Sequence, residues 1–338
     1  MQTKIEWTAT YLPDGRVFPG YTFNPWWGCV KVSPACKFCY AETWDKRWGG
    51  DNWGPNSNRR KFGIKHWNEP LKWNKYAGEI GVRLKVFCAS MADWAEDNNS
   101  IVYERERLFE LIKATPNLNW LLLTKRMDEK IIDKLPKDWG RGYDNVWIGT
   151  TCENQEEANK RIPHLLKVPA NVHFVSAEPL LGSIDFENIP LSNSVFLNSF
   201  FGENGIDWII AGGESGDQAR PMHRDWAIDI MKQCKNNAVS FFFKQWGEWQ
   251  DGSNCIDKKY KGRHIVMLNN GEYVEWDLKT NSPFKTEIEL QKKYSKEEYQ
   301  KLNPIVLSMV GKHKSGRNLF IDKKDFSFNE MPTQYDII

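Results

Sequence analysis

From about residue 85 onwards, short runs of consecutive apolar residues alternate with longer stretches in which apolar residues recur at helical spacing. The runs predict strands at residues 85–89, 120–123, 146–149, 172–175, 208–211 and 240–243, and the stretches predict helices at 101–114, 128–135, 154–166 and 225–236. Strands that are apolar throughout and separated by helices indicate a parallel sheet covered on both faces. With a further candidate strand before Cys29, this number of strands favours a full or partial (β/α) barrel.

Polar residues follow five of these strands at the point where each apolar run ends. Because the carboxyl ends of parallel strands share one rim, where barrels build their active sites, we expect these five groups to surround one site. The groups are Ser90-Met91-Ala92-Asp93, Thr124-Lys125-Arg126, Thr150-Thr151-Cys152-Glu153, Ser176-Ala177-Glu178-Pro179 and Gly212-Gly213-Glu214-Ser215.

After about residue 248 the alternation stops. Residues 265–268 and 273–276 flank an Asn-Asn-Gly turn, which predicts a β-hairpin, and Ser295 with Glu298 three residues later predicts the start of a short helix. We therefore expect a barrel domain with an N-terminal cysteine loop at 1–249. Residues 250–338 are expected to form an α+β appendage packed on that barrel.

Composition narrows the class of protein. The 338-residue chain is 41% hydrophobic, so it can bury a core. It has no run of about 18 apolar residues and no signal-like N-terminus, which predicts a soluble cytoplasmic protein. Lys and Arg number 46 against 44 Asp and Glu, too small an excess to suggest long contacts with duplex DNA. The basic runs at 59–61, 258–261 and 312–314 are expected to be solvated surface, and most of the 17 Trp are expected in the core or in pocket walls.

Three of the seven cysteines lie close together, as Cys29-x6-Cys36-x2-Cys39. Thiolates in one short loop suit a metal ion or an iron–sulfur cluster, whose ligands must converge within a few ångströms. A structural zinc needs a fourth ligand, and the nearest histidine, His66, has no finger-like spacing. Three cysteines without a fourth fit a [4Fe-4S] cluster that leaves one iron open to a small molecule.

Other segments carry a family resemblance. Three clustered cysteines with an aromatic residue before the last one, Phe38-Cys39, ahead of β/α units resemble the radical S-adenosylmethionine superfamily, although its commoner spacing is x3 then x2. The chain more closely resembles the phage-associated Gp37/Gp68 family, a domain of unknown function. The matching segments are KIEWT at 4–8, FNP at 23–25, GC at 28–29, CKFCYAE at 36–42, LLTKR at 122–126, SAEPLLG at 176–182, GGESG at 212–216, ARPMH at 219–223, FFKQWG at 242–247, GR at 316–317 and EMP at 330–332.

The superfamily resemblance implies a barrel of the radical S-adenosylmethionine type with two cofactors, a [4Fe-4S] cluster and S-adenosylmethionine. Cys29, Cys36 and Cys39 would ligate three irons, and S-adenosylmethionine would chelate the fourth. Reductive cleavage would give a 5′-deoxyadenosyl radical that abstracts hydrogen from the substrate. An electron donor such as flavodoxin or ferredoxin is then the expected partner.

Further site residues are expected from the resemblance and from the strand ends. Phe38 is expected either against the adenine of the cofactor or in the core. Ser90 lies at the place where relatives hold the cofactor. Lys125 is expected to bind the carboxylate of the cofactor or a substrate phosphate, or to form a surface ion pair. Glu178, before a proline that sets the following turn, is a pocket candidate expected to contact the cofactor. Glu214 is expected to face the substrate, since its Gly-Gly-Glu motif follows the sixth strand rather than the second. Cys152 is a candidate radical relay, while its default, shared with Cys88, Cys234 and Cys255, is a buried inert thiol.

The phage association suggests a nucleotide or a modified pyrimidine in phage DNA as substrate, with a rearrangement or isomerisation as the reaction. Two readings of other classes remain open. One is a non-catalytic nucleic-acid-binding protein with a structural zinc. The other is a cluster-bearing partner in phage defence or counter-defence that performs no turnover.

Overall fold

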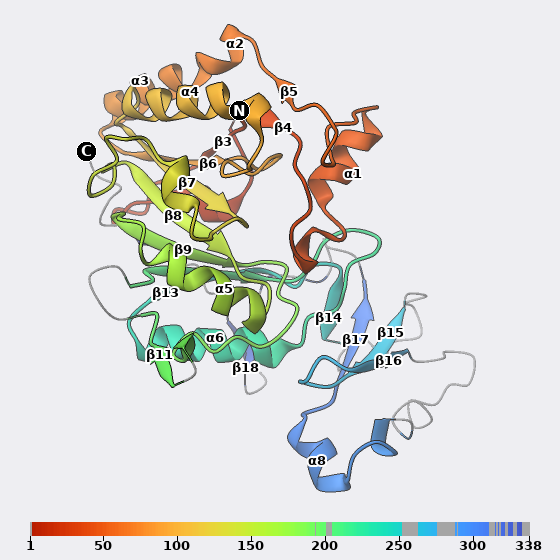
Figure 1. The fold of residues 1–338 in the computed structure, drawn as a ribbon. Coiled ribbons are helices and arrows are strands. Elements are labelled where there is room, and N and C mark those ends of the chain that lie inside the picture. Colours follow the sequence, from red (N-terminus) through yellow and green to blue (C-terminus); the bar gives the residue numbers. More distant parts are fainter. Residues whose placement is uncertain are drawn as a thin grey trace.

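Seven parallel strands form the central sheet of the computed structural model (Figure 1). The structure describes residues 2–192, 194–200, 205–251, 263–275, 288, 290–310, 315, 317, 319–321, 324–326 and 330–332. The strands follow one another across the sheet in chain order and curl into a half-barrel, so the prediction of a partial barrel is confirmed. They are β3 (Tyr21–Phe23), β6 (Leu84–Cys88), β7 (Leu118–Thr124), β8 (Val146–Thr151), β9 (Val172–Ala177), β12 (Trp208–Gly212) and β13 (Ser240–Gln245).

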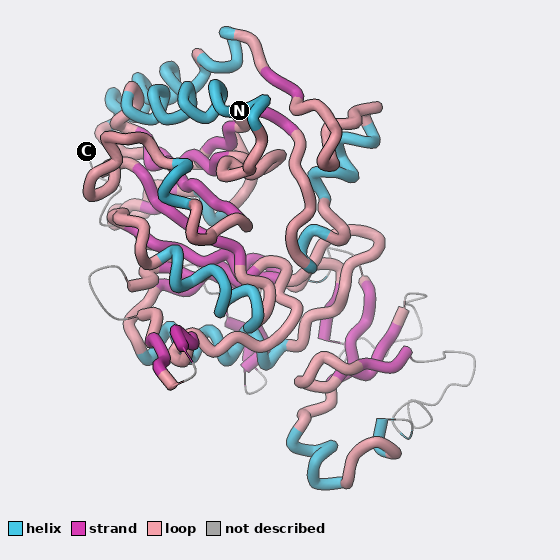
Figure 2. The backbone as a smooth tube through the Cα atoms, in the orientation of Figure 1, coloured by secondary structure: helices cyan, strands magenta, loops and turns pink. Residues whose placement is uncertain are grey.

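Helices cover the convex face of this sheet (Figure 2), so the prediction of a sheet covered on both faces is met on that face only. Outward side chains such as Val86, Trp120 and Ile148 are fully buried beneath them. The helices are α2 (Ile64–Trp67), α3 (Glu69–Ile80), α4 (Val102–Lys113), α5 (Gln155–Leu165) and α6 (Arg224–Asn236). The helix expected at 128–135 is only a 3-10 turn, η4 (Ile131–Lys134), and the sequence pattern missed α2 and α3.

The concave face holds a second, largely aromatic core. Inward side chains of the strands, among them Phe87, Trp147 and Trp208, are buried together there. Trp7, from the 3-10 helix η1 (Glu6–Thr8), packs among them, with its ring centroid 4.7 Å from that of Phe87 and 6.1 Å from that of Trp208. Because these rings fill the interior, the space available for a ligand lies at the carboxyl ends of the strands.

The segment between β3 and β6 contributes the elements that carry the cysteine loop. These are β4 (Trp26–Trp27), η2 (Pro34–Cys36), α1 (Tyr40–Arg47) and β5 (Arg60–Lys61), with β4 and β5 paired antiparallel. Other short elements are the hairpins β1 (Thr10–Tyr11) with β2 (Val17–Phe18) and β10 (Ile189–Ser192) with β11 (Val195–Leu197), and the turn η3 (Asn99–Ile101).

A second, four-stranded sheet begins at Trp249. Its strands are β14 (Trp249–Asp251), β15 (His264–Met267), β16 (Tyr273–Glu275) and β17 (Ile305–Met309), followed by the pair β18 (Leu319–Ile321) and β19 (Lys324–Phe326). The predicted hairpin is confirmed by the antiparallel pairing of β15 with β16. The predicted cap is confirmed as well, since Ser295 and Glu298 form a capping box at α8 (Lys296–Lys301). None of the helices in the described ranges combines the length and the apolar character that a membrane crossing requires.

The last described residues return to the half-barrel. The indole Nε1 of Trp208 donates to the carbonyl of Glu330 at 3.0 Å, and the amide of Glu330 donates to the carbonyl of Phe241 at 3.1 Å. Met331 joins the concave core. Residues beyond 250 therefore do more than pack on the outside, because their far end completes the interior of the sheet.

Replacing Trp7 with alanine should strongly destabilise the protein, because it empties the centre of the concave core. We expect the free energy of unfolding to fall by about 3–5 kcal/mol, as for other buried aromatic residues. Chemical denaturation followed by circular dichroism measures this change. The matched control is Trp48→Ala, whose ring is 73% exposed and whose loss should change stability by about 0.5 kcal/mol or less. Equal midpoints for the two variants would contradict the role given to Trp7.

Candidate functional site

A cavity of about 230 Å³ lies at the carboxyl ends of the strands. All five polar groups that follow predicted strands contribute to its wall, so the expectation that they share one rim is confirmed. The contributing side chains and backbone positions include Ser90, Asp93, Thr124, Lys125, Thr151, Ser176, Glu178, Gly213, Glu214 and Ser215.

The cysteine loop forms the opposite wall. Cys29, Cys36 and Cys39 all line the cavity and are all partly buried. Gly28 precedes the loop with φ 110°, a conformation that other residues rarely adopt, and a Cβ there would lie 2.2 Å from the carbonyl oxygen of Asn52. Pro34 occupies the first turn of η2, which ends at Cys36, and Cys39 is the residue before α1. The local sequence thus turns the chain sharply at Gly28 and again at η2, and all three cysteines line the cavity.

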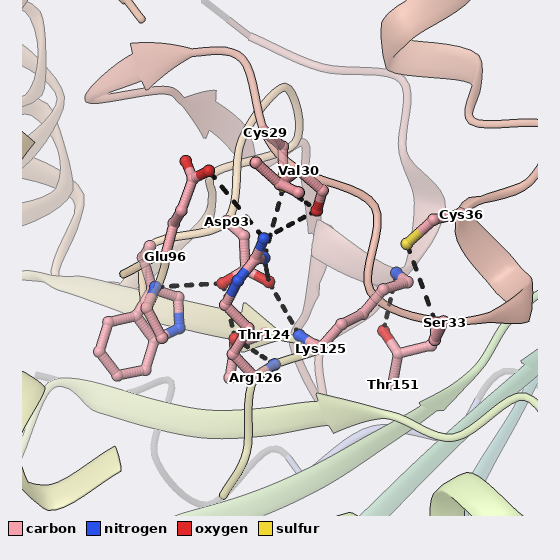
Figure 3. Close-up of polar contacts among 12 residues, drawn as sticks. Cys29, Val30, Ser33, Cys36, Asp93, Glu96, Thr124, Lys125, Arg126 and Thr151 are labelled. Carbon is pink, nitrogen blue, oxygen red and sulfur yellow. Dashed lines mark hydrogen bonds and ion pairs between the residues drawn. The ribbon is translucent and has the colours of Figure 1, made fainter. Parts of the chain in front are cut away.

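Arg126 ties the start of this loop to the sheet (Figure 3). Its Nη1 donates to Oδ2 of Asp93 at 2.9 Å and contacts Sγ of Cys29 at 3.4 Å, while Nη2 donates to the carbonyl of Val30 at 2.7 Å. Asp93 also accepts from the hydroxyl of Thr124 at 2.6 Å. Burial alone would raise the pKa of Asp93, but the charge of Arg126 and these hydrogen bonds outweigh it, so the net pKa is lowered. The pair is therefore ionised and holds Cys29 against the strand ends.

A second buried pair anchors the segment behind the loop. The guanidinium of Arg59 donates to both carboxylate oxygens of Glu96, at 2.9 and 2.6 Å, with both side chains almost fully buried. It also donates to the carbonyl oxygens of Asn52, Ser57 and Gly54. The expectation that the basic run at 59–61 is solvated surface is therefore wrong for Arg59, because a charge with five acceptors within reach is satisfied without water.

A third buried pair holds the other end of the loop. Glu153 accepts from the backbone amide of Ala35 at 3.0 Å and from Nη1 of Arg161 at 2.9 Å, and its side chain is fully buried. Burial tends to raise the pKa of Glu153, but Arg161 and the hydrogen bonds from the loop lower it overall. Glu153 belongs to one of the five polar groups, but the pattern of the sequence did not single it out as a site residue.

The three thiols fit an iron–sulfur cluster by chemistry and by location. They are soft ligands, they come from one loop and they line one cavity. The expectation that they converge to ligand distance is not met, because within the described residues no three His, Cys, Asp or Glu side chains are gathered closely enough to hold a metal ion. In Figure 3 the sulfur of Cys29 points to Arg126, whereas that of Cys36 points to Ser33. Burial and the Asp93 charge raise the pKa of Cys29 to about 12. Binding a cluster would require these side chains to turn towards one another.

Lys125 lies beside Arg126 but has different surroundings. Its Nζ donates to the hydroxyl of Thr151 at 3.2 Å, and no carboxylate of the described residues forms an ion pair with it. The alternative of a surface ion pair is thus not observed for Lys125. The two adjacent cations have separate tasks, since Arg126 is fully engaged in holding the loop and Lys125 offers its charge to the cavity.

The predicted acidic residues both line the cavity, but each is paired with a cation. The carboxylate of Glu178 lies 3.0 Å from Nζ of Lys244, and that of Glu214 receives two hydrogen bonds from the guanidinium of Arg220, at 2.8 and 2.6 Å. Lys244 was not among the predicted site residues. It follows the apolar run at 240–243, so the rule that polar strand ends share one rim could have identified it.

Phe38 and Ser90 also line the cavity. Phe38 is partly exposed, so the alternative of a core side chain does not hold, and the guanidinium carbon of Arg220 lies 5.3 Å from its ring centroid. Ser90 is held by the side-chain amide of Asn24, which donates to its hydroxyl at 3.1 Å. The structure therefore brings Phe38, Ser90, Lys125, Glu178 and Glu214 together with the three cysteines around one space.

Cys152 does not belong to this set, which corrects its expected role as a radical relay. Its side chain is fully buried in the core on the helical side of the sheet and does not line the cavity. Burial raises the pKa of its thiol. Cys152 is therefore a buried, inert thiol, as the default interpretation had it. Cys88 and Cys234 are buried as well. Cys255 lies outside the described residues.

Comparison with known proteins gives a family but no activity. A family model described as a protein of unknown function, DUF5131, matches residues 2–323. No curated protein matches the chain. Among solved structures, a mutant of spore photoproduct lyase is 13% identical, with 80% of this chain and 72% of that chain covered and a TM-score of 0.36. At that TM-score the likeness supports no statement about fold or chemistry.

Removing Arg126 should destabilise the protein because it leaves the Asp93 charge buried without its partner. We expect Arg126→Ala and Asp93→Asn each to lower the free energy of unfolding by about 3–5 kcal/mol, and the double variant to lose clearly less than the sum. Denaturant titration of the four proteins measures this coupling.

The matched control is Lys75→Ala, since Lys75 forms an exposed ion pair with Glu79 that should contribute about 0.5 kcal/mol or less. An Arg126→Ala variant as stable as Lys75→Ala would show that the loop is held by other contacts.

Proposed function

The chain belongs to the DUF5131 family, whose function is unknown, and we propose from its site that it is a radical S-adenosylmethionine enzyme. One observation carries the proposal. Three cysteines from one loop line a cavity at the carboxyl ends of a parallel half-barrel, and no other cysteine of the described residues does so. This is the end of the sheet at which such folds place their chemistry.

In this proposal Cys29, Cys36 and Cys39 hold a [4Fe-4S] cluster through three of its irons. When bound, the cluster and S-adenosylmethionine supply one-electron reductive cleavage that yields a 5′-deoxyadenosyl radical able to abstract hydrogen. The cluster needs an external one-electron donor, for which a protein of the flavodoxin or ferredoxin kind is the proposed partner.

The buried ion pairs place the ligands. Arg126 holds the backbone at Val30 and touches the sulfur of Cys29, and Glu153 holds the amide of Ala35, next to Cys36. Hydrogen bonds to a ligating sulfur also tune the potential of an iron–sulfur cluster. Arg126 is in this sense a positioning residue.

The cavity wall provides contacts for an organic ligand. Lys125 is a cation without a carboxylate partner among the described residues, so it suits the carboxylate of S-adenosylmethionine or a substrate phosphate. Phe38 presents a partly exposed ring on which an adenine could stack. Glu214 and Glu178 are held in place by Arg220 and Lys244 and would orient a substrate rather than move protons.

For the substrate we propose a nucleotide or a modified pyrimidine in DNA, with rearrangement or isomerisation as the reaction. Support comes from an aromatic ring and from a lysine that forms no ion pair within the described part of the chain, which together match a base and a phosphate in one cavity.

Anaerobic reconstitution tests the reaction class. We expect a brown protein with about four irons and four sulfides per chain, which forms 5′-deoxyadenosine from S-adenosylmethionine after reduction. Cys36→Ala should abolish both results, because only two cavity cysteines remain.

Cys234→Ala is the matched control, since this thiol is buried in α6 away from the cavity, and the variant should keep its cluster. A colourless protein with one zinc per chain would contradict the proposal and favour a zinc-containing binding protein. A cluster without any cleavage would favour the partner that performs no turnover.

A further inference from the structure

Helix α1 carries an exposed aromatic stripe that starts at the cavity. Tyr40, Trp44 and Trp48 follow one another at intervals of four residues and therefore lie along one side of the helix and its end. Their exposed fractions are 58%, 46% and 73%. Tyr40 also lines the cavity, where its hydroxyl donates to the carbonyl of Ser90 at 2.7 Å. The stripe therefore leads from solvent to the site.

The rings of the stripe continue onto a neighbouring element. The ring centroids of Trp44 and Trp48 lie 6.0 Å apart, and that of Trp27, on β4, lies 6.3 Å from Trp44. The guanidinium carbon of Arg60, on β5, is 4.6 Å from the centroid of the Trp27 ring. Figure 1 shows α1, β4 and β5 together to one side of the parallel sheet.

This region is far more basic than the rest of the chain. Residues 31–65 contain eight Lys and Arg against three Asp and Glu, a net charge of +5 where the whole chain carries +2, so the remainder is net negative. Arg59 and Lys61 of this range pair with Glu96 and Glu104 from outside it, which leaves an excess of three positive charges. Arg47 and Arg60 are exposed and form no ion pair with a carboxylate among the described residues. Lys46, by contrast, pairs with Glu42. Arg60 stacks on the half-buried ring of Trp27, and Arg47 precedes Trp48 directly in the chain.

Exposure of these rings is unusual in this protein. Other tryptophans, such as Trp26, Trp94 and Trp120, are fully buried, so packing accounts for them and not for the stripe. A row of accessible rings offers flat faces for successive bases, and adjacent arginines suit the phosphates between them. A protein partner would match the apolar rings but would not explain the concentration of positive charge.

We infer that Trp44 and Trp48, with Arg47 and Arg60, bind single-stranded nucleic acid and guide one nucleotide past Tyr40 into the cavity. The inference rests on the proposed function only for what happens to that nucleotide. Binding itself needs neither cluster nor S-adenosylmethionine, so the two proposals can fail separately.

Fluorescence anisotropy with labelled dT12 and with a duplex of equal length tests this surface on the full chain, before and after reconstitution. We expect the wild-type protein to bind the single strand more tightly than the duplex. Trp44→Ala/Trp48→Ala should weaken binding at least about tenfold, because stacking is lost for two bases. Arg47→Ala/Arg60→Ala should make the dependence of affinity on salt shallower by about one to two released ions.

The matched control is Tyr103→Ala on α4, a 67% exposed ring away from the stripe, which should bind as the wild type does. Unchanged unfolding midpoints confirm that the variants are folded. The inference would be overturned if the tryptophan variant bound dT12 as tightly as the wild type. It would also be overturned if the wild type bound the duplex as tightly as the single strand, or if polyglutamate at matched charge displaced dT12. A wild type that binds dT12 but takes up no cluster would overturn the proposed function alone.

Discussion

The site depends on a small set of buried guanidinium–carboxylate pairs. Arg126 with Asp93, Arg59 with Glu96 and Arg161 with Glu153 connect the cysteine loop and the segment behind it to the carboxyl ends of the strands. The loop is only partly buried at its three cysteines, so packing alone does not fix its position. Ion pairs shielded from water can hold such a loop, provided that every hydrogen-bond donor and acceptor in them is satisfied. The pairs thus hold the chain at Cys29 and beside Cys36, at Ala35.

The two cores explain why the cavity lies where it does. Rings on the concave face, with Trp7 at their centre, fill the interior of the half-barrel, while helices cover the convex face. Side chains that point inwards beyond the aromatic layer are polar and meet the cysteine loop. The cavity therefore lies between the sheet and a loop held by charges. In the proposed function, the thiols of this loop would have to turn towards one another to hold a cluster.

Residues that are adjacent in the chain have different roles in this site. Lys125 and Arg126 follow one strand, yet the side chains leave it in different directions, so one faces the cavity and the other the loop. Glu153 and Cys152 differ in the same way, because one reaches the loop and the other enters the helical core. Alternation along an extended chain makes such a switch between adjacent residues routine, and spacing alone does not say which neighbour reaches the site.

The sequence by itself determined the parallel sheet, the rim on which the polar groups gather, and the three cysteines, because apolar periodicity and strand direction are local properties that survive folding. Only the tertiary structure decided that Arg59 and Glu153 are buried, that Lys244 faces the cavity and that Cys152 does not. These outcomes depend on which distant segments meet, such as residue 35 with residue 153, and on whether the charges find partners there. A pattern along the chain contains neither the contacts between distant segments nor the partners of the buried charges.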